Sequence, residues 1–481
     1  MNEDRQFQIA FVLLSILCVL PLWVCTYPPF TDLPQHAATI SVALHWFDPS
    51  YGYQKIYDVN WAASQVFTHA LTWALAHVLP LMVAMKLVLS AAFIGIPLST
   101  LHLVRQHEGN PWWVLAVFPL VYGYSTVWGF YNFIPGTPLA ILLVSMCWTY
   151  AKTPSWRRAL GLALFAHGLF LTHILALAYA ACIGASLLVL CCRPIRQAAL
   201  GVLALASPLP LVIAWWIHAP RDPFPVPTRW DVGIGRLPVL FDFQLSNTPE
   251  LDALGGAILL LLLPFLLGAR PARQLYRWVP LLITLAVFFL APMTIASTAY
   301  LYARAAVFVL PMLLFALQDR GTRRPLAKLV ASGAPAVVLL LFTARYAAYE
   351  REVGDFRQVL KGLEPHRRVL LLSTVPVSEY APGRVYMHYG CYYQAERGGV
   401  ADFSFAELHP AYFRYKESAH PHLPGVEWFP ERFRFALHGA RYDYVLVRGP
   451  LLPDWFAGVP MEAYDVLSAK GGWHVISRRD R

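Results

Sequence analysis

Asp32 and His36 stand four residues apart in "PPFTDLPQHAATI", residues 28 to 40, directly after the first long apolar run of the chain. Residues i and i+4 of a helix lie above one another, so both side chains would share one face. A carboxylate at the end of a membrane helix can act as general base toward an acceptor hydroxyl or amine. The imidazole could orient that carboxylate, bind a phosphate or share a metal ion with it. The structural alternative is that Asp32 caps a helix beginning at Leu33-Pro34 and that His36 is an ordinary polar helix residue.

Three further ionisable residues interrupt apolar segments. His167 and His173 lie in "LFAHGLFLTHILALAY", and Arg304 lies in "STAYLYARAAVFVLP". Ionisable groups inside a membrane are costly, so each is a candidate functional residue. His173 falls near the outer end of its predicted helix, and the guanidinium fork of Arg304 fits phosphate oxygens well. The alternatives are a hydrogen bond to a neighbouring helix for the histidines and snorkelling to lipid headgroups for Arg304.

Two loop positions complete the candidates for substrate binding. Asn132 lies in the aromatic-rich turn "VWGFYNFIPGTPLAILL" and is either a turn residue or a substrate contact. Arg229, with Arg221 and Arg236, lies in a proline-rich stretch, where these residues add positive potential over one face or are simply solvated. The seven cysteines form no CxxC or zinc-site spacing. No metal ligand set is predicted, although the Asp32–His36 pair leaves the use of a divalent metal open.

The elements that must position these residues are apolar. The 481 residues are 57% hydrophobic and 14% charged, whereas an ordinary soluble protein is about a quarter charged. Runs close to the roughly 20 residues that span a bilayer recur up to about residue 346, and the first has no evident cleavage site. The sequence predicts an α-helical polytopic membrane protein with about eleven transmembrane helices. The expected spans are 7–26, 81–104, 111–128, 132–150, 159–174, 175–192, 198–218, 252–268, 279–296, 300–317 and 329–346.

Charge predicts the orientation of these helices. The net charge of +10 is concentrated in short connections and forms no aromatic-interleaved stripe for nucleic acid. Basic residues near helix ends favour the cytoplasmic side, so the N-terminus is expected there. The basic clusters are Arg105; Lys152, Arg157 and Arg158; Arg193 and Arg196; Arg270, Arg273 and Arg277; and Arg320, Arg323, Arg324 and Lys328.

Two domains are expected. Residues 1–346 form the transmembrane domain, with outer loops at about 27–80 and 219–251. The first loop has an apolar seam at helical spacing between Leu33 and Phe47, and the second is too proline-rich for a helix. After residue 346, a helix at 355–363 and strands at 367–374, 442–449 and 473–479 predict a small extracytoplasmic α/β domain over 347–481.

The sequence lacks the motifs by which enzymes bind nucleotides or activate common hydrolytic nucleophiles. It has no P-loop, no GxGxxG after a strand, no HExxH and no GxSxG. An enzyme built on this chain would therefore take its driving force from an activated substrate.

The same segments, in this order, resemble the GT-C superfamily of polytopic glycosyltransferases, which take sugars from polyprenyl-phosphate donors. The resemblance rests on "YPPFTDLPQHAATI", "WGFYNFIPGTPLAILL", "LFLTHILALAY", "YLYARAAVFVLP" and the tail pattern "DFRQVLKGL…RRVLLLST…YDYVLVRG", as in uncharacterised bacterial members. It implies that Asp32 occupies the place of the catalytic acid and that Arg304 steadies the donor phosphate. Better-studied members often carry paired acids, whereas Asp32 is followed by Leu-Pro-Gln-His, which leaves metal use and activity less secure.

The resemblance implies a specific expected function. A sugar would move, with inversion presumed, from a polyprenyl-phosphate donor to a glycan, lipid or protein acceptor at the outer face of a bacterial inner membrane. Two alternatives remain at this stage: a transporter or flippase for a lipid-linked saccharide, and a non-catalytic membrane subunit of an envelope-assembly complex.

Overall fold

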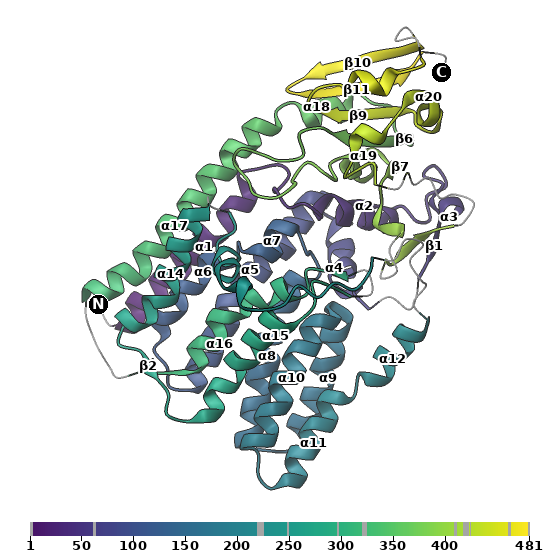
Figure 1. The fold of residues 1–481 in the computed structure, drawn as a ribbon. Coiled ribbons are helices and arrows are strands. Elements are labelled where there is room, and N and C mark those ends of the chain that lie inside the picture. Colours follow the sequence, from purple (N-terminus) through teal and green to yellow (C-terminus); the bar gives the residue numbers. More distant parts are fainter. Residues whose placement is uncertain are drawn as a thin grey trace. The chain divides into compact units, whose positions relative to one another are not determined.

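The computed structural model describes residues 3–60, 64–218, 226–247, 250–295, 298–319, 325–407, 411–416, 423, 425–459 and 463–479 (Figure 1). The chain divides by its internal contacts into two compact units. Unit 1 comprises Met1–Trp23, Ala62–Thr68 and Lys86–Ala344, and unit 2 comprises Val24–Trp61, His69–Met85 and Arg345–Arg481. Each unit is described in turn.

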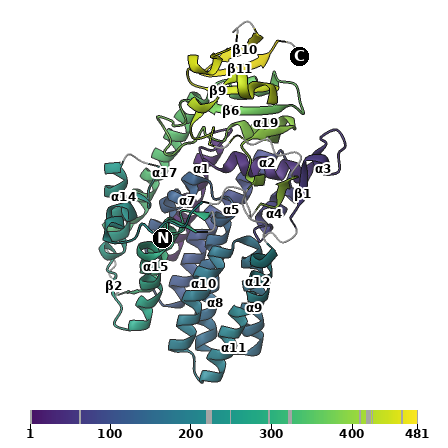
Figure 2. The same cartoon turned by 45° about the vertical axis from the view of Figure 1, so that its right-hand side comes forward.

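Unit 1 is built of apolar helices (Figures 1 and 2). Among the described residues, six helical stretches are long and apolar enough to cross a membrane, and three shorter apolar helices accompany them. The chain is therefore a polytopic membrane protein. The main helices are α1 (Glu3–Trp23), α5 (Leu81–Gln106), α8 (Phe133–Lys152), α9 (Trp156–Thr172), α10 (Ile174–Cys191), α11 (Ile195–Ala206), α12 (Leu209–His218), α14 (Glu250–Leu266), α15 (Val279–Leu290), α16 (Val309–Phe315) and α17 (Pro325–Val353).

Two predicted spans are irregular in the structure. The span 111–128 is broken into a 3-10 turn η1 (Pro111–Ala116) and two short helices, α6 (Val117–Leu120) and α7 (Tyr124–Trp128). The span 300–317 begins as a 3-10 helix, η4 (Tyr302–Phe308), before it continues as α16.

The prediction that the second outer loop contains no helix is wrong. Within it the structure forms a 3-10 turn η2 (Ile234–Arg236) and the short helix α13 (Leu237–Asp242). Pro238 lies in the first turn of α13, where a proline loses no hydrogen bond and its fixed φ suits the helix. The residues Arg221, Arg320, Arg323 and Arg324 lie outside the described residues.

Small residues allow the central helices to approach closely. A Cβ atom added at Gly136 of α8 would lie 3.2 Å from Cβ of Ala176 on α10, and one added at Gly184 would lie 2.6 Å from Sγ of Cys147. Close backbone approach at small residues is a common basis of helix association in membranes. Larger side chains at these two positions would push α8 and α10 apart.

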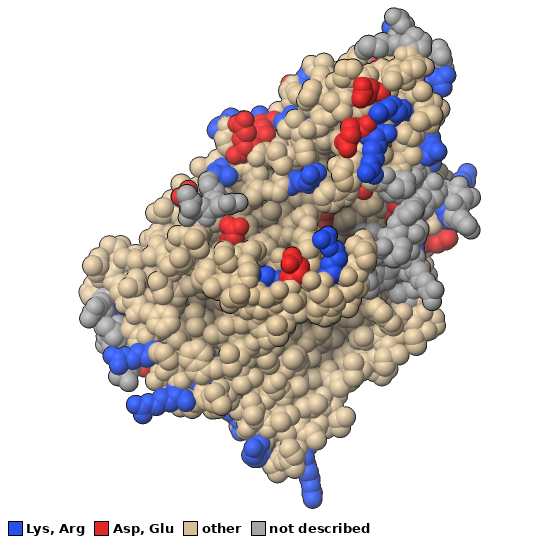
Figure 3. All heavy atoms as spheres, viewed as in Figure 1, with Lys and Arg blue, Asp and Glu red and all other residues tan. Residues whose placement is uncertain are grey.

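The surface of unit 1 suits a membrane. Figure 3 shows its helices almost free of charged atoms, whereas unit 2 carries Lys, Arg, Asp and Glu together. Exposed side chains such as Leu164, Val189 and Leu203 lie on these helices. Exposed apolar side chains on a long apolar helix are expected where lipid is the solvent.

Unit 2 contains a five-stranded sheet in the order β10-β11-β9-β6-β7. The central strand β6 (Arg368–Ser373) pairs in parallel with both β7 (Val400–Asp402) and β9 (Tyr444–Arg448). Strands β11 (Trp473–Arg478) and β10 (Tyr464–Lys470) continue the sheet in antiparallel fashion. Its core includes Leu370, Leu372, Val445, Val447 and Trp455.

Three of these strands, β6, β9 and β11, confirm the predicted ones, and the helix α18 (Phe356–Lys361) confirms the predicted helix at 355–363. Strands β7 and β10 and the helix α19 (Gly390–Arg397) were not predicted, because "GGVAD" and "YDVLSAK" lack the dense apolar pattern of β6. The sheet and its helices confirm a small α/β domain near the C-terminus.

The segment after α1 belongs to unit 2. Its helix α2 (Leu33–Leu44) packs on α19, and the strand β1 (Tyr57–Val59) pairs with β8 (Phe413–Tyr415). The amide and hydroxyl of Thr26 donate hydrogen bonds of 2.7 and 2.5 Å to the carboxylate of Glu350. These bonds join residues far apart in sequence, so the first loop and the C-terminal part fold as one unit.

Candidate functional site

The candidate residues fall into two groups, one in each unit. The first, called the Asp32 cluster, consists of Asp32, His36, His69 and His388. Asp32 lies at the N-cap position of α2, and its backbone carbonyl accepts hydrogen bonds from the amides of Gln35 (3.1 Å) and His36 (3.3 Å). Among the described residues, its side chain makes no capping hydrogen bond. The position is that of a cap, yet the carboxylate is not used as one.

The carboxylate of Asp32 has an imidazole beside it instead. Nε2 of His388 lies 3.6 Å from Oδ1 of Asp32, and the two side chains are 5% and 15% exposed. Burial lowers the pKa of His388 to about 3, so this imidazole is neutral at pH 7. A neutral imidazole next to a largely buried carboxylate can orient it without neutralising its charge. Sequence reasoning missed His388, which lies in the short stretch "YMHYG" of the C-terminal part, outside any apolar run of membrane length.

Gln35 and two phenylalanines complete the surroundings of this cluster. The side-chain amide of Gln35 donates to the carbonyl of Phe403 and accepts from the amide of Phe405, both at 3.0 Å. The Phe405 ring lies 5.7 Å from the His36 ring and 6.0 Å from the His388 ring. The chain after β7 is thereby held against the first turns of α2.

His36 has a partner that the sequence did not indicate. Its Nδ1 lies 3.0 Å from Nε2 of His69, on the helix α4 (Phe67–Ala76). In the described part of the chain, no group of three or more His, Cys, Asp or Glu side chains is arranged to hold a metal ion. The chemistry proposed below is therefore derived from the side chains themselves.

The second group, called the Arg304 cluster, lies in unit 1 and consists of Phe130, Asn132, Phe133, His173 and Arg304. The guanidinium carbon of Arg304 lies 3.5 Å from the centre of the Phe130 ring and 5.5 Å from that of Phe133. Its Nη2 donates to the carbonyl of Ala299 at 3.4 Å. Stacking on an aromatic face fixes the plane of the guanidinium while it keeps its charge.

His173 lies where α9 ends and α10 begins. Its φ of −166° is extended rather than helical, and its Nδ1 accepts a 3.2 Å hydrogen bond from the amide of Leu175. Since Nδ1 accepts, the proton of the neutral ring is on Nε2, which is a donor. The ring packs edge-on against Phe133 at 5.1 Å, so His173 and Arg304 contact the same phenylalanine. His167 instead bonds the carbonyl of Ala163 within its own helix (2.8 Å).

Asn132 is 6% exposed at the start of α8. Among the described residues, its Oδ1 is buried without a hydrogen-bond partner. A buried acceptor in this state costs on the order of 1–3 kcal/mol and calls for an explanation, such as a ligand. Asn132 does lie at a turn, as one of the two alternatives held, but a turn does not explain why its Oδ1 is buried without a hydrogen-bond partner.

Arg229 approaches the same region through its backbone. Its amide donates to the carbonyl (3.2 Å) and hydroxyl (3.1 Å) of Thr294, on the hairpin of β3 (Thr294–Ile295) and β4 (Thr298–Ala299). The carbonyl that Arg304 contacts belongs to Ala299 of this hairpin. The side chain of Arg229 is exposed, whereas Arg236 is buried under Tyr302, with 3.7 Å between its guanidinium carbon and the ring centre.

A narrow pocket lies beside the Arg304 cluster, between α5, α7, α8 and η4. Its lining includes Tyr124, Thr126, Thr137 and Ala303. The space of about 10 Å³ holds about one water molecule, so this pocket as it stands accommodates no isoprenoid chain.

The fold is similar to those of two solved structures. The crystal structure of ArnT from Cupriavidus metallidurans bound to undecaprenyl phosphate aligns with a TM-score of 0.55 at 12% identity, over 99% of this chain and 98% of that one. The cryo-EM structure of the arabinofuranosyltransferase AftD from Mycobacteria aligns with a TM-score of 0.54 at 12% identity, over 99% of this chain and 40% of AftD. No family model and no curated protein matches the sequence. The chain shares the fold of these two structures over nearly its whole length, and this is a polytopic helical fold of the kind that its sequence predicted.

Proposed function

We propose that this chain, whose fold is that of the GT-C superfamily, is a membrane glycosyltransferase that moves a sugar from a polyprenyl-phosphate donor to an acceptor. The observation that carries the proposal is the Arg304 cluster. His173 and Arg304 come from distant segments and both contact the ring of Phe133 in a unit of apolar helices. Asn132 directly precedes Phe133 in the sequence. The undecaprenyl phosphate bound to ArnT supports this class of donor.

In this proposal the Arg304 cluster binds the head of the donor. The guanidinium of Arg304, held on Phe130, pairs with phosphate oxygens, and Nε2–H of His173 is available as a second donor. The unpartnered Oδ1 of Asn132 accepts a hydrogen bond from a hydroxyl of the sugar. The apolar surface of unit 1 suits the isoprenoid tail.

Asp32 acts as the general base. As the acceptor oxygen attacks the anomeric carbon, its proton passes to the carboxylate of Asp32. The bond between the anomeric carbon and the phosphate oxygen breaks, and polyprenyl phosphate leaves with the electron pair. Arg304 stabilises the charge that grows on that phosphate, and His388 holds the Asp32 carboxylate in place. That Asp32 and Arg304 act on one donor is part of the proposal.

The orientation is proposed on the basis of the charges. Basic residues at the ends of helices in unit 1 support a cytoplasmic N-terminus. In this proposal Asp32 and unit 2 lie on the outer face of a bacterial inner membrane. Modification of a cysteine introduced at Asp58 by an impermeant reagent in intact cells tests this side. Protection of that cysteine until the membrane is opened would reverse the orientation.

The decisive experiment follows the sugar. The purified protein is mixed with a radiolabelled polyprenyl-phosphate sugar and a membrane glycan fraction, and label is measured in the acceptor. Transfer by the wild-type chain that is lost in Asp32→Asn supports the proposal. Movement of intact donor across vesicles without transfer would indicate a flippase, and neither transfer nor movement would indicate a non-catalytic subunit.

A further inference from the structure

An open pocket of about 710 Å³ lies in unit 2, away from the residues of the Asp32 cluster. Its polar lining consists of Arg351, Glu352, Ser378, Glu379, Tyr380 and Arg448. The volume lies within the range of roughly 300–1,000 Å³ that is typical of small-ligand sites. None of these residues has a part in the transfer step described above.

The pocket lies at the carboxyl ends of parallel strands. Arg448 is the last residue of β9, and Val375 follows the end of β6 by two residues. In the sheet, β6 lies between β7 and β9. The chain runs from β6 to β7 on one side of β6 and then crosses to β9 on its other side. The direction of strand order therefore reverses at β6. In open α/β sheets, ligands bind outside the carboxyl ends of the strands at such a reversal.

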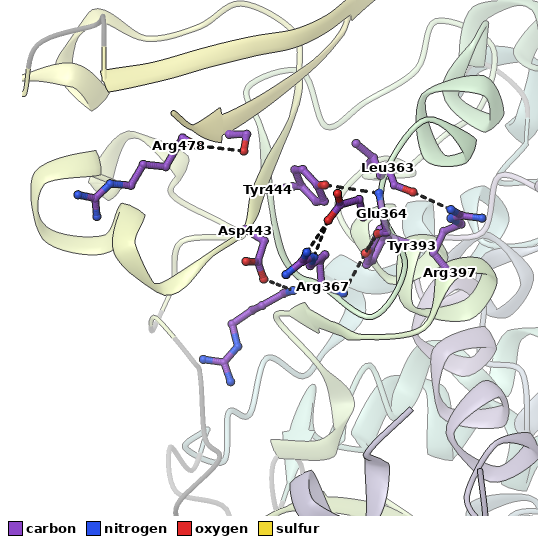
Figure 4. Close-up of polar contacts among 10 residues, drawn as sticks. Leu363, Glu364, Arg367, Tyr393, Arg397, Asp443, Tyr444 and Arg478 are labelled. Atoms are coloured by element: carbon purple, nitrogen blue, oxygen red, sulfur yellow. Dashed lines mark hydrogen bonds and ion pairs between the residues drawn. The ribbon is translucent and has the colours of Figure 1, made fainter. Parts of the chain in front are cut away.

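At the amino ends of these strands, side chains bind the backbone before β6, as Figure 4 shows. There the carboxylate of Asp443 accepts from the amide of Arg368 (2.8 Å), and the hydroxyl of Tyr444 accepts from the amide of Glu364 (3.4 Å). Arg397 donates to the carbonyl of Leu363 at 2.7 Å. Side chains of the domain thus satisfy the backbone before β6, whereas the carboxyl edge opens into a pocket.

Arg448 is built rigidly into the pocket wall. Its Nη1 donates to the carbonyl of Gly471 at 2.6 Å, and its guanidinium carbon lies 4.5 Å from the centre of the Tyr386 ring and 5.1 Å from that of Trp473. Its Nη2 lies 3.9 Å from Oε1 of Glu352, whose other oxygen accepts from the hydroxyl of Ser378. The donors and acceptors of the wall are therefore fixed before a ligand arrives.

The chemistry of the wall favours a neutral polyol. The lining carries two guanidinium groups, of Arg351 and Arg448, and two carboxylates, of Glu352 and Glu379, and Arg448 lies beside Glu352. A phosphate would meet the carboxylates, and an amine would meet the guanidinium groups, whereas hydroxyl groups donate to one and accept from the other. The partly exposed ring of Tyr380 adds an apolar face. We propose that this pocket holds a neutral sugar unit of the acceptor glycan, an inference that rests on the proposed transferase function.

The position of the pocket suits an acceptor that also reaches Asp32. Phe403, next to His388 in the Asp32 cluster, directly follows β7, which is two strands away from β9 in the same sheet. Arg448, at the end of β9, lies opposite Ser373 of β6, and Asp402, at the end of β7, lies opposite Leu370 of β6. The spacing between strands and the rise per residue then put the ends of β9 and β7 roughly 14 Å apart. A short oligosaccharide spans this distance.

Val377→Trp tests the pocket without touching its fixed wall, because Val377 lines the pocket and its side chain is 52% exposed. The matched control is Val466→Trp on the edge strand β10, where the side chain is 50% exposed. The full-length protein in detergent is titrated with neutral di- to tetrasaccharides of glucose, mannose, galactose and arabinose, and with uronate- and phosphate-bearing counterparts. Saturation-transfer NMR measures the Kd of each.

We expect neutral oligosaccharides to bind the wild type, Val466→Trp and Asp32→Asn alike, and Val377→Trp to raise the Kd at least tenfold. In transfer assays, Val377→Trp should raise the acceptor KM and leave the donor KM unchanged. Equal binding by Val377→Trp, tighter binding of the anionic sugars, or no binding of any probe would overturn the proposal. Glycan binding that Val377→Trp removes, in a wild-type chain that transfers no sugar, would refute the transferase function and keep the saccharide site.

Discussion

The Arg304 cluster and the Asp32 cluster differ in what surrounds their polar groups. In the Arg304 cluster, single polar residues lie among apolar helices and are held by phenylalanine rings. In the Asp32 cluster, the key carboxylate lies beside a second buried polar residue, His388, which comes from a different part of unit 2. The comparison teaches that a polar residue is conspicuous in the sequence when it interrupts an apolar run of membrane length, and is hidden when it lies outside such a run, as His388 does.

The largest expected effect tests the Asp32 cluster, to which the proposal assigns the proton transfer. Asp32→Asn should lower kcat for sugar transfer by about a thousandfold, because the amide cannot accept the acceptor's proton, while donor binding stays intact. Transfer of radiolabel and binding of a fluorescent polyprenyl phosphate measure the two effects. The matched control is Asp58→Asn, an exposed carboxylate of the same loop. Full activity of Asp32→Asn would remove this residue from the mechanism.

Arg304→Ala tests the Arg304 cluster, to which the proposal assigns donor binding. The variant should lower kcat/KM by about a hundredfold, mainly through a higher donor KM, because a charge-assisted contact to phosphate is lost. Arg304→Lys should recover little, since an ammonium cannot stack flat on Phe130 and bind in bidentate fashion. Arg273→Ala, an exposed arginine of unit 1, is the control. An unchanged donor KM and kcat would return Arg304 to a role at the lipid headgroups.

His388 tests whether the partner missed by the sequence matters. His388→Leu should lower kcat about thirtyfold with an unchanged donor KM, because Asp32 is no longer held in place, and His388→Gln should recover part of it. With its pKa near 3, His388 does not titrate between pH 5 and 8, so the shape of the pH–rate profile should persist in both variants. A limb of that profile that disappears in His388→Leu would show that His388 itself exchanges a proton in the reaction.

The last prediction separates the two units by the pH dependence of their stability rather than by catalysis. Burial, with the carboxylates of Asp402 and Glu427, raises the pKa of Glu407 to about 9 from about 4.5. The folded state then holds a proton that the unfolded state has lost, so the stability of unit 2 should fall by about 1.4 kcal/mol per pH unit as the pH rises through this window. Hydrogen exchange at pH 5.5 and 8.5, expressed as protection factors that correct for the base-catalysed rise of the intrinsic rate, should show lower protection around Glu407 at the higher pH and little change of protection in α8 and α10.

Glu407→Gln should remove this pH dependence above about pH 7 and leave below it the part that comes from Glu427, whose pKa burial raises to about 7. Glu431→Gln, an exposed counterpart, should leave the whole dependence as it is. Burial raises the pKa of Asp402 to about 6. This carboxyl therefore contributes to the fall of stability with pH only below about pH 6. A pH dependence that is equal in Glu407→Gln and in the wild type would assign it to other groups.

Much of the fold could be predicted because hydrophobicity dictates it. The helical spans of unit 1 and the strands β6, β9 and β11 are apolar runs of characteristic length. The helix α13 could not be predicted from proline content alone, since Pro238 acts at the start of a helix rather than against it. The union of residues 24–61 with 345–481 depends on contacts such as Thr26 with Glu350, which carry no signal in local sequence.

The candidate site was predicted in part for the same reason. His173 and Arg304 stand out in apolar segments, and the structure brings both to Phe133. The pairing of His36 with His69 and the approach of His388 to Asp32 depend on how segments distant in sequence fold together, which spacing does not reveal. The predicted role of Asp32 as a base stays a prediction until the variants are measured.

The origin of the residues around Asp32 has a consequence for biogenesis. Asp32 is synthesised early, but the imidazole beside it belongs to residue 388, and the amide that Gln35 binds belongs to Phe405. The surroundings of the Asp32 carboxylate therefore cannot form until the ribosome has passed the segment after β7. Under the proposed function, a nascent chain has no assembled general base before that segment has been made and has packed against α2.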